Sequence, residues 1–370
     1  MNDVWFFDHN AGGPVDPDVL ACFVATERSC PGNPASAHAP GRRARGVLEE
    51  ARHRIATALG LRPDDVVFTS GGTEAANLAV HGLGDPRLPV RLSAAEHPAV
   101  LEPALQRGVE WWSVDAHGTA VLADEGPPVG LVALVHAQSE LGTVQPVAAA
   151  AEFAASLGVP LFVDAAQSLG RLDLAPVLTS GAVVALSPHK AGGLRGHGVL
   201  AGHDLAQRVR PLTRGGAQEH GLRPGTQSPA LALANALAIE RAVARRAERA
   251  RAMHAARDTF VSALRDTNVE HRLLTPWANS VPNTAMLHFA RVDGRNLLPA
   301  LDLAGVHASH GSACSTGAPT PPRILTAIGL DDASARACVR FSFGGDEAHA
   351  SLRAAASRVA DVVERLRKKI

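Results

Sequence analysis

Short apolar runs rich in β-branched residues alternate with segments of helical periodicity through the first two thirds of the chain, which severely limits the possible folds. Four of these runs are expected to be buried strands: Val66–Thr69, Gly130–Val135, Pro160–Asp164 and Ala182–Ser187. Helical spacing occurs in Arg42–Leu59, Glu74–Val80, Ala99–Gln106 and Pro146–Leu157. Strands that are apolar throughout are typical of a mostly parallel sheet covered by helices on both faces, so the pattern predicts an α/β domain.

The last third of the chain has a different pattern. A long helix rich in Ala, Arg and Glu is expected from Ser228 to about Leu264, broken once. It would lead into a smaller α+β domain that contains Asn283–Phe289, Val339–Phe343 and a terminal helix over Asp346–Arg367. We therefore predict a large α/β domain over residues 15–245 and a small α+β domain built from residues 1–14 and 246–370.

Charge and composition exclude several classes of protein. The 370 residues contain 36 Lys and Arg and 36 Asp and Glu, so no global basic field is available to hold nucleic acid or an anionic membrane. No apolar run is long enough to span a bilayer, and Met1–Trp5 lacks the features of a signal peptide. Four cysteines do not form a disulfide scaffold, so we expect a cytoplasmic, thiol-reducing environment.

Lysine is almost absent from the chain. Only Lys190, Lys368 and Lys369 are lysines, and the last two belong to the C-terminal tail. Arginine can replace lysine as a charge, but its guanidinium cannot act as an amine nucleophile or form a Schiff base. A lysine retained at position 190 therefore indicates amine chemistry there.

Two charged residues are expected at neighbouring strand ends, where ligand-binding groups gather in α/β sheets. Asp164 ends one apolar run and Lys190 follows the next. The pair would suit either a buried salt bridge or a pyridoxal phosphate site, in which the lysine holds the cofactor and the aspartate keeps the ring nitrogen protonated. Gln167 could then donate to the ring hydroxyl, and His97 could supply an aromatic face and an acid–base group.

Two glycine-rich segments predict different kinds of site. Ser70–Glu74 follows a predicted strand and opens a helix, so its backbone N–H groups suit a phosphate, although a simple capped helix start would have the same pattern. Gly192–Gly198 lacks the spacing of a dinucleotide fingerprint, which disfavours a nicotinamide enzyme.

The four cysteines differ in their surroundings. Cys314 lies in a small, polar, glycine-bracketed segment that predicts an exposed loop, as a nucleophilic cysteine requires. Cys338 and Cys22 have apolar neighbours typical of a core, and Cys30 beside Pro31 is ambiguous. No CxxC or HExxH motif occurs and the 17 histidines are scattered, so we expect no metal site.

Together these motifs resemble, over nearly the whole chain, the cysteine desulfurases of the class V aminotransferase group, which have the fold-type I pyridoxal phosphate architecture. The segments that carry the resemblance are, in order, Asp8–Pro14, Gly32–His38, Phe68–Glu74, Glu96–Pro98, Glu140–Pro146, Val163–Gln167, Ser187–Lys190, Gly215–Glu219, Arg223–Thr226, Gly311–Cys314 and Arg340–Gly344.

The resemblance implies conversion of L-cysteine to L-alanine in a homodimer, with sulfur passed as a persulfide to an acceptor protein. Cys314 would attack the substrate sulfur and Lys190 would bind the cofactor and move the Cα proton, with His97 stacked on the ring. The other implied roles fall on phosphate-binding Gly72, Thr73, Ser187, His189 and the partner subunit's Thr226, on ring-binding Asp164 and Gln167, and on Asn33 and Arg340, which would clamp the substrate carboxylate.

The chain departs from the family pattern in a few places, and other functions stay open. Gln138-Ser139 replaces an asparagine pair, and Gly12-Gly13 replaces two threonines. A selenocysteine lyase, another class V enzyme and a non-catalytic sulfur-transfer scaffold are the alternatives. The acceptor pathway is also open among iron–sulfur assembly, tRNA thiolation and DNA sulfur modification.

Overall fold

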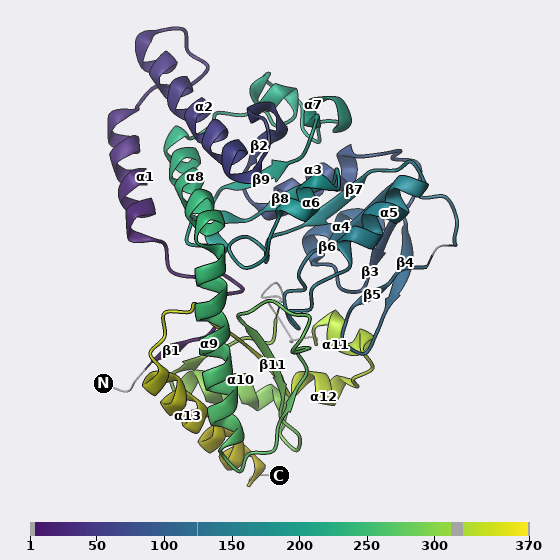
Figure 1. Ribbon diagram of the computed structural model, residues 1–370, viewed down its shortest axis with the longest axis vertical. Helices are drawn as coiled ribbons and strands as arrows, with labels where there is room; N and C mark the ends of the chain where they lie inside the picture. Colours follow the sequence, from purple (N-terminus) through teal and green to yellow (C-terminus); the bar gives the residue numbers. More distant parts are fainter. Residues whose placement is uncertain (1–3, 124, 312–320, 369–370) are drawn as a thin grey trace.

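The computed structural model describes residues 4–123, 125–311 and 321–368 (Figure 1). Within these residues the largest sheet has eight strands in the order β2-β9-β8-β7-β6-β3-β4-β5. In that order they are Val66–Thr69, Gly198–Ala201, Val183–Leu186, Leu161–Asp164, Leu131–Val135, Val90–Ser93, Val109–Val114 and Ala120–Val121. The strands from β8 to β4 run parallel, whereas β9 is antiparallel to both of its neighbours and β5 to β4.

The four predicted strands are confirmed as β2, β6, β7 and β8, to within one residue at each end. The pattern missed β3, β4, β5 and β9. β3 carries Arg91, a charged residue that is nonetheless buried, with its guanidinium 5.9 Å from the ring centre of Phe153. β4 is partly exposed along its length, so it lacks the continuous apolar run of a central strand.

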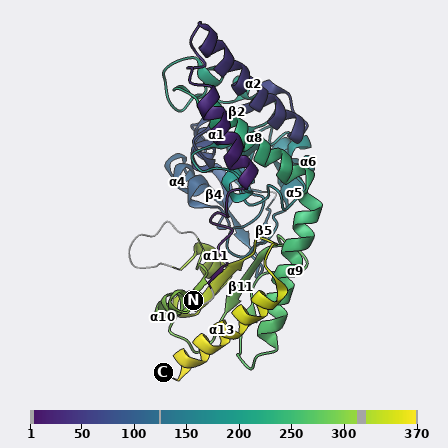
Figure 2. The ribbon, with the colours of Figure 1, turned by 90° about the vertical axis from the view of Figure 1, so that its left-hand side faces the viewer.

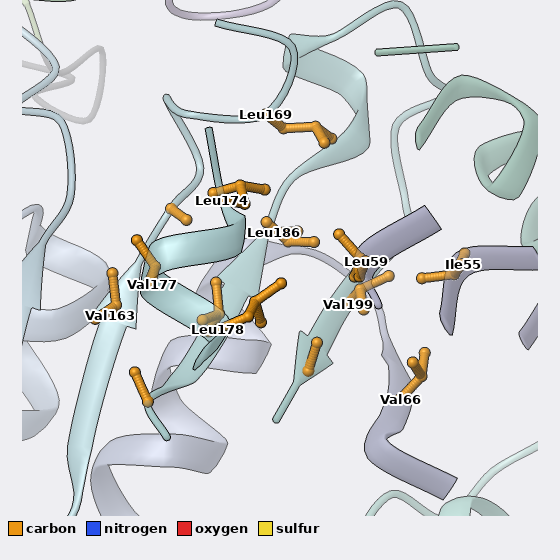
Figure 3. Packing of buried hydrophobic residues seen from close by; sticks show 14 of the residues in the cluster. Ile55, Leu59, Val66, Val163, Leu169, Leu174, Val177, Leu178, Leu186 and Val199 are labelled. Carbon is orange, nitrogen blue, oxygen red and sulfur yellow. The ribbon is translucent and has the colours of Figure 1, made fainter. Parts of the chain in front are cut away.

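Helices cover both faces of the sheet because successive strand residues point to opposite sides. Val66 and Phe68 belong to the core cluster on one face, which α2 (Ala39–Leu59), α5 (Val147–Ser156), α6 (Ala175–Thr179) and α8 (Pro229–Ala244) complete. Val67 belongs to the cluster on the other face, with α3 (Gly72–Gly82), α4 (Pro98–Arg107) and α7 (Leu205–Arg208). Figure 3 shows part of the first layer, with Leu178 and Val177 beside the strand residue Val163.

A smaller unit is built around the three-stranded antiparallel sheet β10-β11-β13, which comprises Arg272–Leu273, Thr284–His288 and Cys338–Ser342. The remaining elements of this unit are β1 (Trp5–Phe6), β12 (Val306–His307), α9 (Arg246–Arg265), α10 (Gly294–Leu303), α11 (Arg323–Ala327), α12 (Asp332–Arg336) and α13 (His349–Arg367). β1 pairs with β12, and Phe7 packs against Phe260 and Phe343, so the N-terminal segment lies among C-terminal elements (Figures 1 and 2).

The long helix after Ser228 is confirmed, and it breaks once, at Arg245, between α8 and α9. α8 packs on α2 and on α1 (Pro17–Ser29) beside the large sheet, whereas α9 packs on α13 in the smaller unit. The predicted domain boundaries at residues 14 and 245 stay a prediction. Short 3₁₀ turns at Pro63–Asp65, Pro188–Lys190 and Gln218–Gly221 complete the elements.

In the described part of the chain, no helix combines the length and apolar character needed to cross a membrane. Over the same residues, no three His, Cys, Asp or Glu side chains gather in a way that could hold a metal ion. Cys338 is buried, as expected, and so is Cys30. Cys22 is only half-buried, because the apolar stretch that contains it forms α1, which lies on the surface.

Candidate active site

A cavity of about 230 Å³ lies at the carboxyl ends of the parallel strands, facing β13 of the smaller unit. Asp164 is the last residue of β7, Ser187 follows β8, and Arg340 projects from β13. Nine of the predicted site residues line it: Gly72, Thr73, His97, Asp164, Gln167, Ser187, His189, Lys190 and Arg340. Gly72 and Asp164, for example, are far apart in the chain and meet here because the strand ends converge at one edge of the sheet.

Lys190 is held in the 3₁₀ turn Pro188–Lys190, where its N–H donates to Ser187 O, just after β8, at 3.1 Å. Desolvation in the surrounding protein lowers the pKa of its amine to about 8, aided by the positive charges of Arg171 and Arg340. The carboxylates of Asp164 and Glu140 act in the opposite direction. A larger share of this amine is therefore unprotonated, and nucleophilic, at neutral pH than of an ordinary lysine.

Two histidines in the cavity are held neutral. His97 caps α4, where its Nδ1 accepts the N–H of Ala99 at 3.1 Å, so the neutral ring carries its proton on Nε2. Burial lowers the pKa of His97 and outweighs the opposing effect of Asp164 and Glu140, while Lys190 and Arg340 act with burial. Burial, with Lys190 and Arg195 nearby, also lowers the pKa of His189 to about 4.

The start of α3 forms a tight cradle with the end of β8. A Cβ atom at Gly72 would lie 2.3 Å from Oγ of Ser187, so only glycine lets the helix start approach that hydroxyl. The first N–H groups of a helix have no partners within it, and its N-terminus carries positive potential. Gly72, Thr73 and Ser187 thus surround a place suited to an anion such as a phosphate.

Gln167 and Asp164 belong to the turn that follows β7. The Asp164 side chain accepts the N–H of Ala166 at 2.9 Å, which fixes one carboxylate oxygen. Gln167 Nε2 donates to the main-chain oxygen of Asn10 at 3.0 Å. Both side chains are almost completely buried, so they are held firmly in the cavity wall.

Arg340 is 2% exposed and its guanidinium is only partly satisfied. Nη1 donates to Ser139 O at 2.9 Å, and Nη2 donates to Asp8 Oδ1 at 2.7 Å. Nε is buried without an acceptor. Because Arg340 lines the cavity and these two contacts fix its guanidinium, a carboxylate entering the cavity would find a cation already in position.

Two predicted site residues that the structure describes do not line this cavity. Asn33 is exposed, with its Oδ1 accepting the N–H of Ala35. Thr226 is exposed and lines a separate cavity of about 150 Å³ with Ser70 and His197. Cys314 lies outside the described residues; Gly311, three positions before it, lines the main cavity.

Sequence reasoning gave no role to several residues that build the site. Asn10 lines the cavity, and its side chain bonds Ser139 O, Thr284 Oγ1 and Asn283 Nδ2. Arg171 lies behind Gln167 and is 3% exposed. A charged residue four positions after Gln167 was the available signal for Arg171. Nothing local marks Asn10, whose partners are 129 or more positions away.

The substituted pair Gln138-Ser139 has a defined role in this structure. Gln138 Oε1 accepts the N–H groups of Glu140 and Leu141, and its Nε2 donates to the Glu140 carboxylate. Ser139 contributes its main-chain oxygen to Arg340 and its hydroxyl to Glu140. Gln138 therefore stabilises the turn, and Ser139, rather than Gln138, lines the cavity.

Comparison with known proteins agrees with this geometry. Residues 5–353 match the family model described as aminotransferase class-V. A cysteine desulfurase from Frankia sp. (strain EuIK1) is 36% identical, and the match covers 98% of this chain and 92% of that protein. A solved structure of a NifS-like protein is 29% identical with a TM-score of 0.88, covering 98% of this chain and 100% of the other. A structure of SspA in complex with cysteine is 28% identical with a TM-score of 0.79, covering 93% of this chain and 99% of the other. The chain belongs to the class V aminotransferase family, among its cysteine desulfurases.

Proposed function

We propose that the protein is a pyridoxal phosphate-dependent cysteine desulfurase, which converts L-cysteine to L-alanine and transfers the sulfur as a persulfide. The observation that carries the proposal is the meeting of Lys190, Asp164 and the Gly72–Ser187 cradle in one cavity that also contains Arg340. An amine, a ring-nitrogen partner, an anion cradle and a carboxylate-binding group are the four elements that such chemistry needs. Membership of the cysteine desulfurases supports the choice of substrate.

The residues present fit the cofactor. The start of α3 approaches Ser187 so closely that a Cβ at Gly72 would lie 2.3 Å from Ser187 Oγ, which brings the hydroxyl and the helix-start N–H groups together, as phosphate binding requires. Lys190 has no ion-pair partner among the described side chains, and burial lowers the pKa of its amine to about 8. Gly72, Thr73, Ser187 and His189 would hold the phosphate, Lys190 the aldehyde carbon, and Asp164 and Gln167 the ring. The bound cofactor would act as an electron sink that makes the Cα proton of the substrate acidic.

The chain's own residues divide the remaining work. Arg340, which lines the cavity, would bind the substrate carboxylate through its guanidinium and orient Cα toward Lys190. Lys190, once freed, would take the Cα proton as a general base, which its lowered pKa favours at neutral pH. His97, with its proton on Nε2, would stack on the ring and can donate that proton to a developing thiolate or carbanion.

Cys314 would complete the reaction. Its thiolate attacks the substrate sulfur, so an S–S bond forms as the Cβ–S bond breaks, and the electron pair returns toward carbon. Protonation of carbon then gives alanine, and a persulfide is left on Cys314, with no external oxidant required. Gly311, three positions before Cys314, lines the cavity, and a Cβ there would lie 2.4 Å from Cγ of Glu140, so the backbone at Gly311 packs closely against the cavity wall.

A homodimer and a sulfur acceptor belong to the same proposal. Thr226 and Asn33 are exposed and lie outside the cavity of their own chain. In a dimer these positions are free to serve the partner's site, where the family places Thr226 near the phosphate. The acceptor would take sulfur from Cys314, and its pathway among iron–sulfur assembly, tRNA thiolation and DNA sulfur modification is open.

The test is product formation by purified protein supplied with pyridoxal phosphate and L-cysteine, with alanine, persulfide and cofactor absorbance measured together. Wild type should form all three signals. Cys314→Ala should keep the cofactor band but lose alanine formation, and Lys190→Ala should lose the band itself. Cys338→Ala, which alters a buried cysteine away from the cavity, is the matched control and should retain turnover.

The result also separates the alternatives. Faster turnover of selenocysteine than of cysteine would indicate a selenocysteine lyase. A cofactor band without turnover of either substrate would contradict the proposal and favour another class V reaction. Absence of any band would leave a sulfur-transfer scaffold.

A further inference from the structure

Arg171 is a buried cation for which the proposed reaction has so far no use. It is 3% exposed and follows Gln167 by four positions. Its Nη1 donates to the side-chain Oε1 and the main-chain oxygen of Gln167, the latter at 3.1 Å, and Nη2 donates to His9 O at 3.3 Å. Nε is buried without an acceptor, and no carboxylate in the described residues pairs with Arg171.

This arrangement determines which end of the Gln167 amide faces which neighbour. A guanidinium can only donate, so the atom of Gln167 that it contacts must be the oxygen. One N–H of Nε2 is already given to Asn10 O at 3.0 Å. Because Gln167 lines the cavity, the second N–H of its Nε2 is the group available to a bound molecule.

A purely structural role explains Arg171 poorly. Its charged neighbours include Arg249 and Arg340, and burial together with these two cations lowers the pKa of Arg171 to about 9. Keeping a cation buried with carbonyl partners alone costs more than filling the same space with an apolar side chain. The cost is understandable if the position requires a rigid donor and a positive charge beside the cavity.

We propose that Arg171 is a positioning residue of the cofactor site: it fixes the Gln167 amide so that an N–H, and never the amide oxygen, faces the ring oxygen of the bound cofactor. Without Arg171 the amide can rotate, and its oxygen would then repel an anionic ring oxygen. The guanidinium also places a second positive charge near Lys190, whose pKa it lowers. The inference rests on the proposed binding of pyridoxal phosphate to Lys190.

The test uses the cofactor-loaded protein and the pH midpoint of its absorbance change, which reports protonation at the cofactor rather than turnover. Arg171→Met removes both the cation and the donor that holds Gln167. Loss of the nearby cation and loss of the N–H facing the ring oxygen both favour the protonated form of the bound cofactor. The midpoint should therefore rise by about one pH unit, a tenfold change in proton affinity. Arg171→Lys keeps the charge and one donor, and should give a smaller shift in the same direction.

A double-mutant cycle separates positioning from simple charge. If Arg171 acts through Gln167, Arg171→Met should shift the midpoint by less than half as much in a Gln167→Met background as in wild type. Equal shifts in both backgrounds would overturn the positioning role. So would an unshifted midpoint in Arg171→Lys, a result that can be obtained even if Arg171→Met does not fold.

Arg107 provides a matched control. It also donates to main-chain oxygens, those of Leu83 at 3.0 Å and Asp85 at 2.7 Å, but it lies on α4 outside the cavity. Arg107→Met should lower stability and leave the midpoint unchanged. A wild-type protein that forms no cofactor band would refute the proposed function, whereas a normal band with an unshifted Arg171→Met midpoint would refute only this inference.

Discussion

Arg340 and Asp8 lie 332 positions apart in the chain, yet Nη2 of the arginine donates to Oδ1 of the aspartate at 2.7 Å. The contact joins β13 to the segment that follows β1. With the bond from Nη1 to Ser139 O, it fixes the orientation of the guanidinium. Nε is left buried and unpaired. The group proposed to bind the substrate carboxylate is therefore oriented before any substrate arrives.

Arg340→Lys should raise the KM for L-cysteine at least about tenfold and change kcat less. Lysine keeps a charge but lacks the planar fork, so it cannot satisfy Asp8 and Ser139 and still present a donor to the substrate. Steady-state kinetics give the two constants separately. Arg257→Lys, which changes another almost fully buried arginine outside the cavity, should leave KM as in wild type. An unchanged KM in Arg340→Lys would remove Arg340 from carboxylate binding.

Gly72→Ala should weaken cofactor binding about tenfold or more, because the added Cβ would lie 2.3 Å from Ser187 Oγ. Titration of the apoprotein with pyridoxal phosphate, followed by absorbance, measures the effect. Adding Ser187→Ala should cost less in this background than alone, since the Ser187 Cβ is 3.7 Å from the new methyl group. At Gly71, a Cβ would meet nothing within 4 Å, so Gly71→Ala should weaken binding less than Gly72→Ala. Equal losses at the two glycines would contradict the close approach as the cause.

Asn10→Ala should lower the free energy of unfolding by about 3 kcal/mol. The substitution removes three buried or half-buried side-chain hydrogen bonds, to Ser139 O, Thr284 Oγ1 and Asn283 Nδ2, each worth about 1 kcal/mol. Urea denaturation at pH 8 gives the value. Asn77→Ala, which removes the bonds of a half-buried side chain to Thr73 O at 2.9 Å and Ala99 O at 3.4 Å, should cost only about 1 kcal/mol. A loss at Asn10 no larger than that at Asn77 would show that the network adds little to stability.

His197→Leu should make the protein more resistant to mild acid. Burial lowers the pKa of His197 to about 4, and both ring nitrogens are unpartnered. The unfolded chain protonates near 6.5, so stability is intact above that pH and falls as the pH drops toward 4. Between pH 8 and pH 5 this one residue would account for about 2 kcal/mol of lost stability.

Urea denaturation at the two pH values tests this expectation. The loss between pH 8 and pH 5 should shrink by about 2 kcal/mol in His197→Leu. His53→Gln, at an exposed position of α2, should lose as much as wild type. A leucine variant with the same acid sensitivity as wild type would show that His197 is protonated in the folded protein.

Local pattern was sufficient for the main strands, the long broken helix and the positions of Asp164 and Lys190 at strand ends. Each of these depends on residues close together in the chain: apolar runs, glycine before a helix, a helix-favouring Ala-rich stretch. β3 was missed because its buried Arg91 interrupts the apolar run, and the burial of a charge is compensated by groups far away.

The tertiary structure alone decided how the site is held together. The orientation of Arg340 depends on Asp8, the Gln167 amide depends on Asn10 and Arg171, and the room at Gly72 depends on Ser187. Hydrogen bonds are directional and short-ranged, so their partners are known only when the chain has brought distant segments together. The sequence by itself determined which chemical groups are present and the edge of the sheet at which they gather. The fold decided which atoms face the cavity and which are already hydrogen-bonded within the protein.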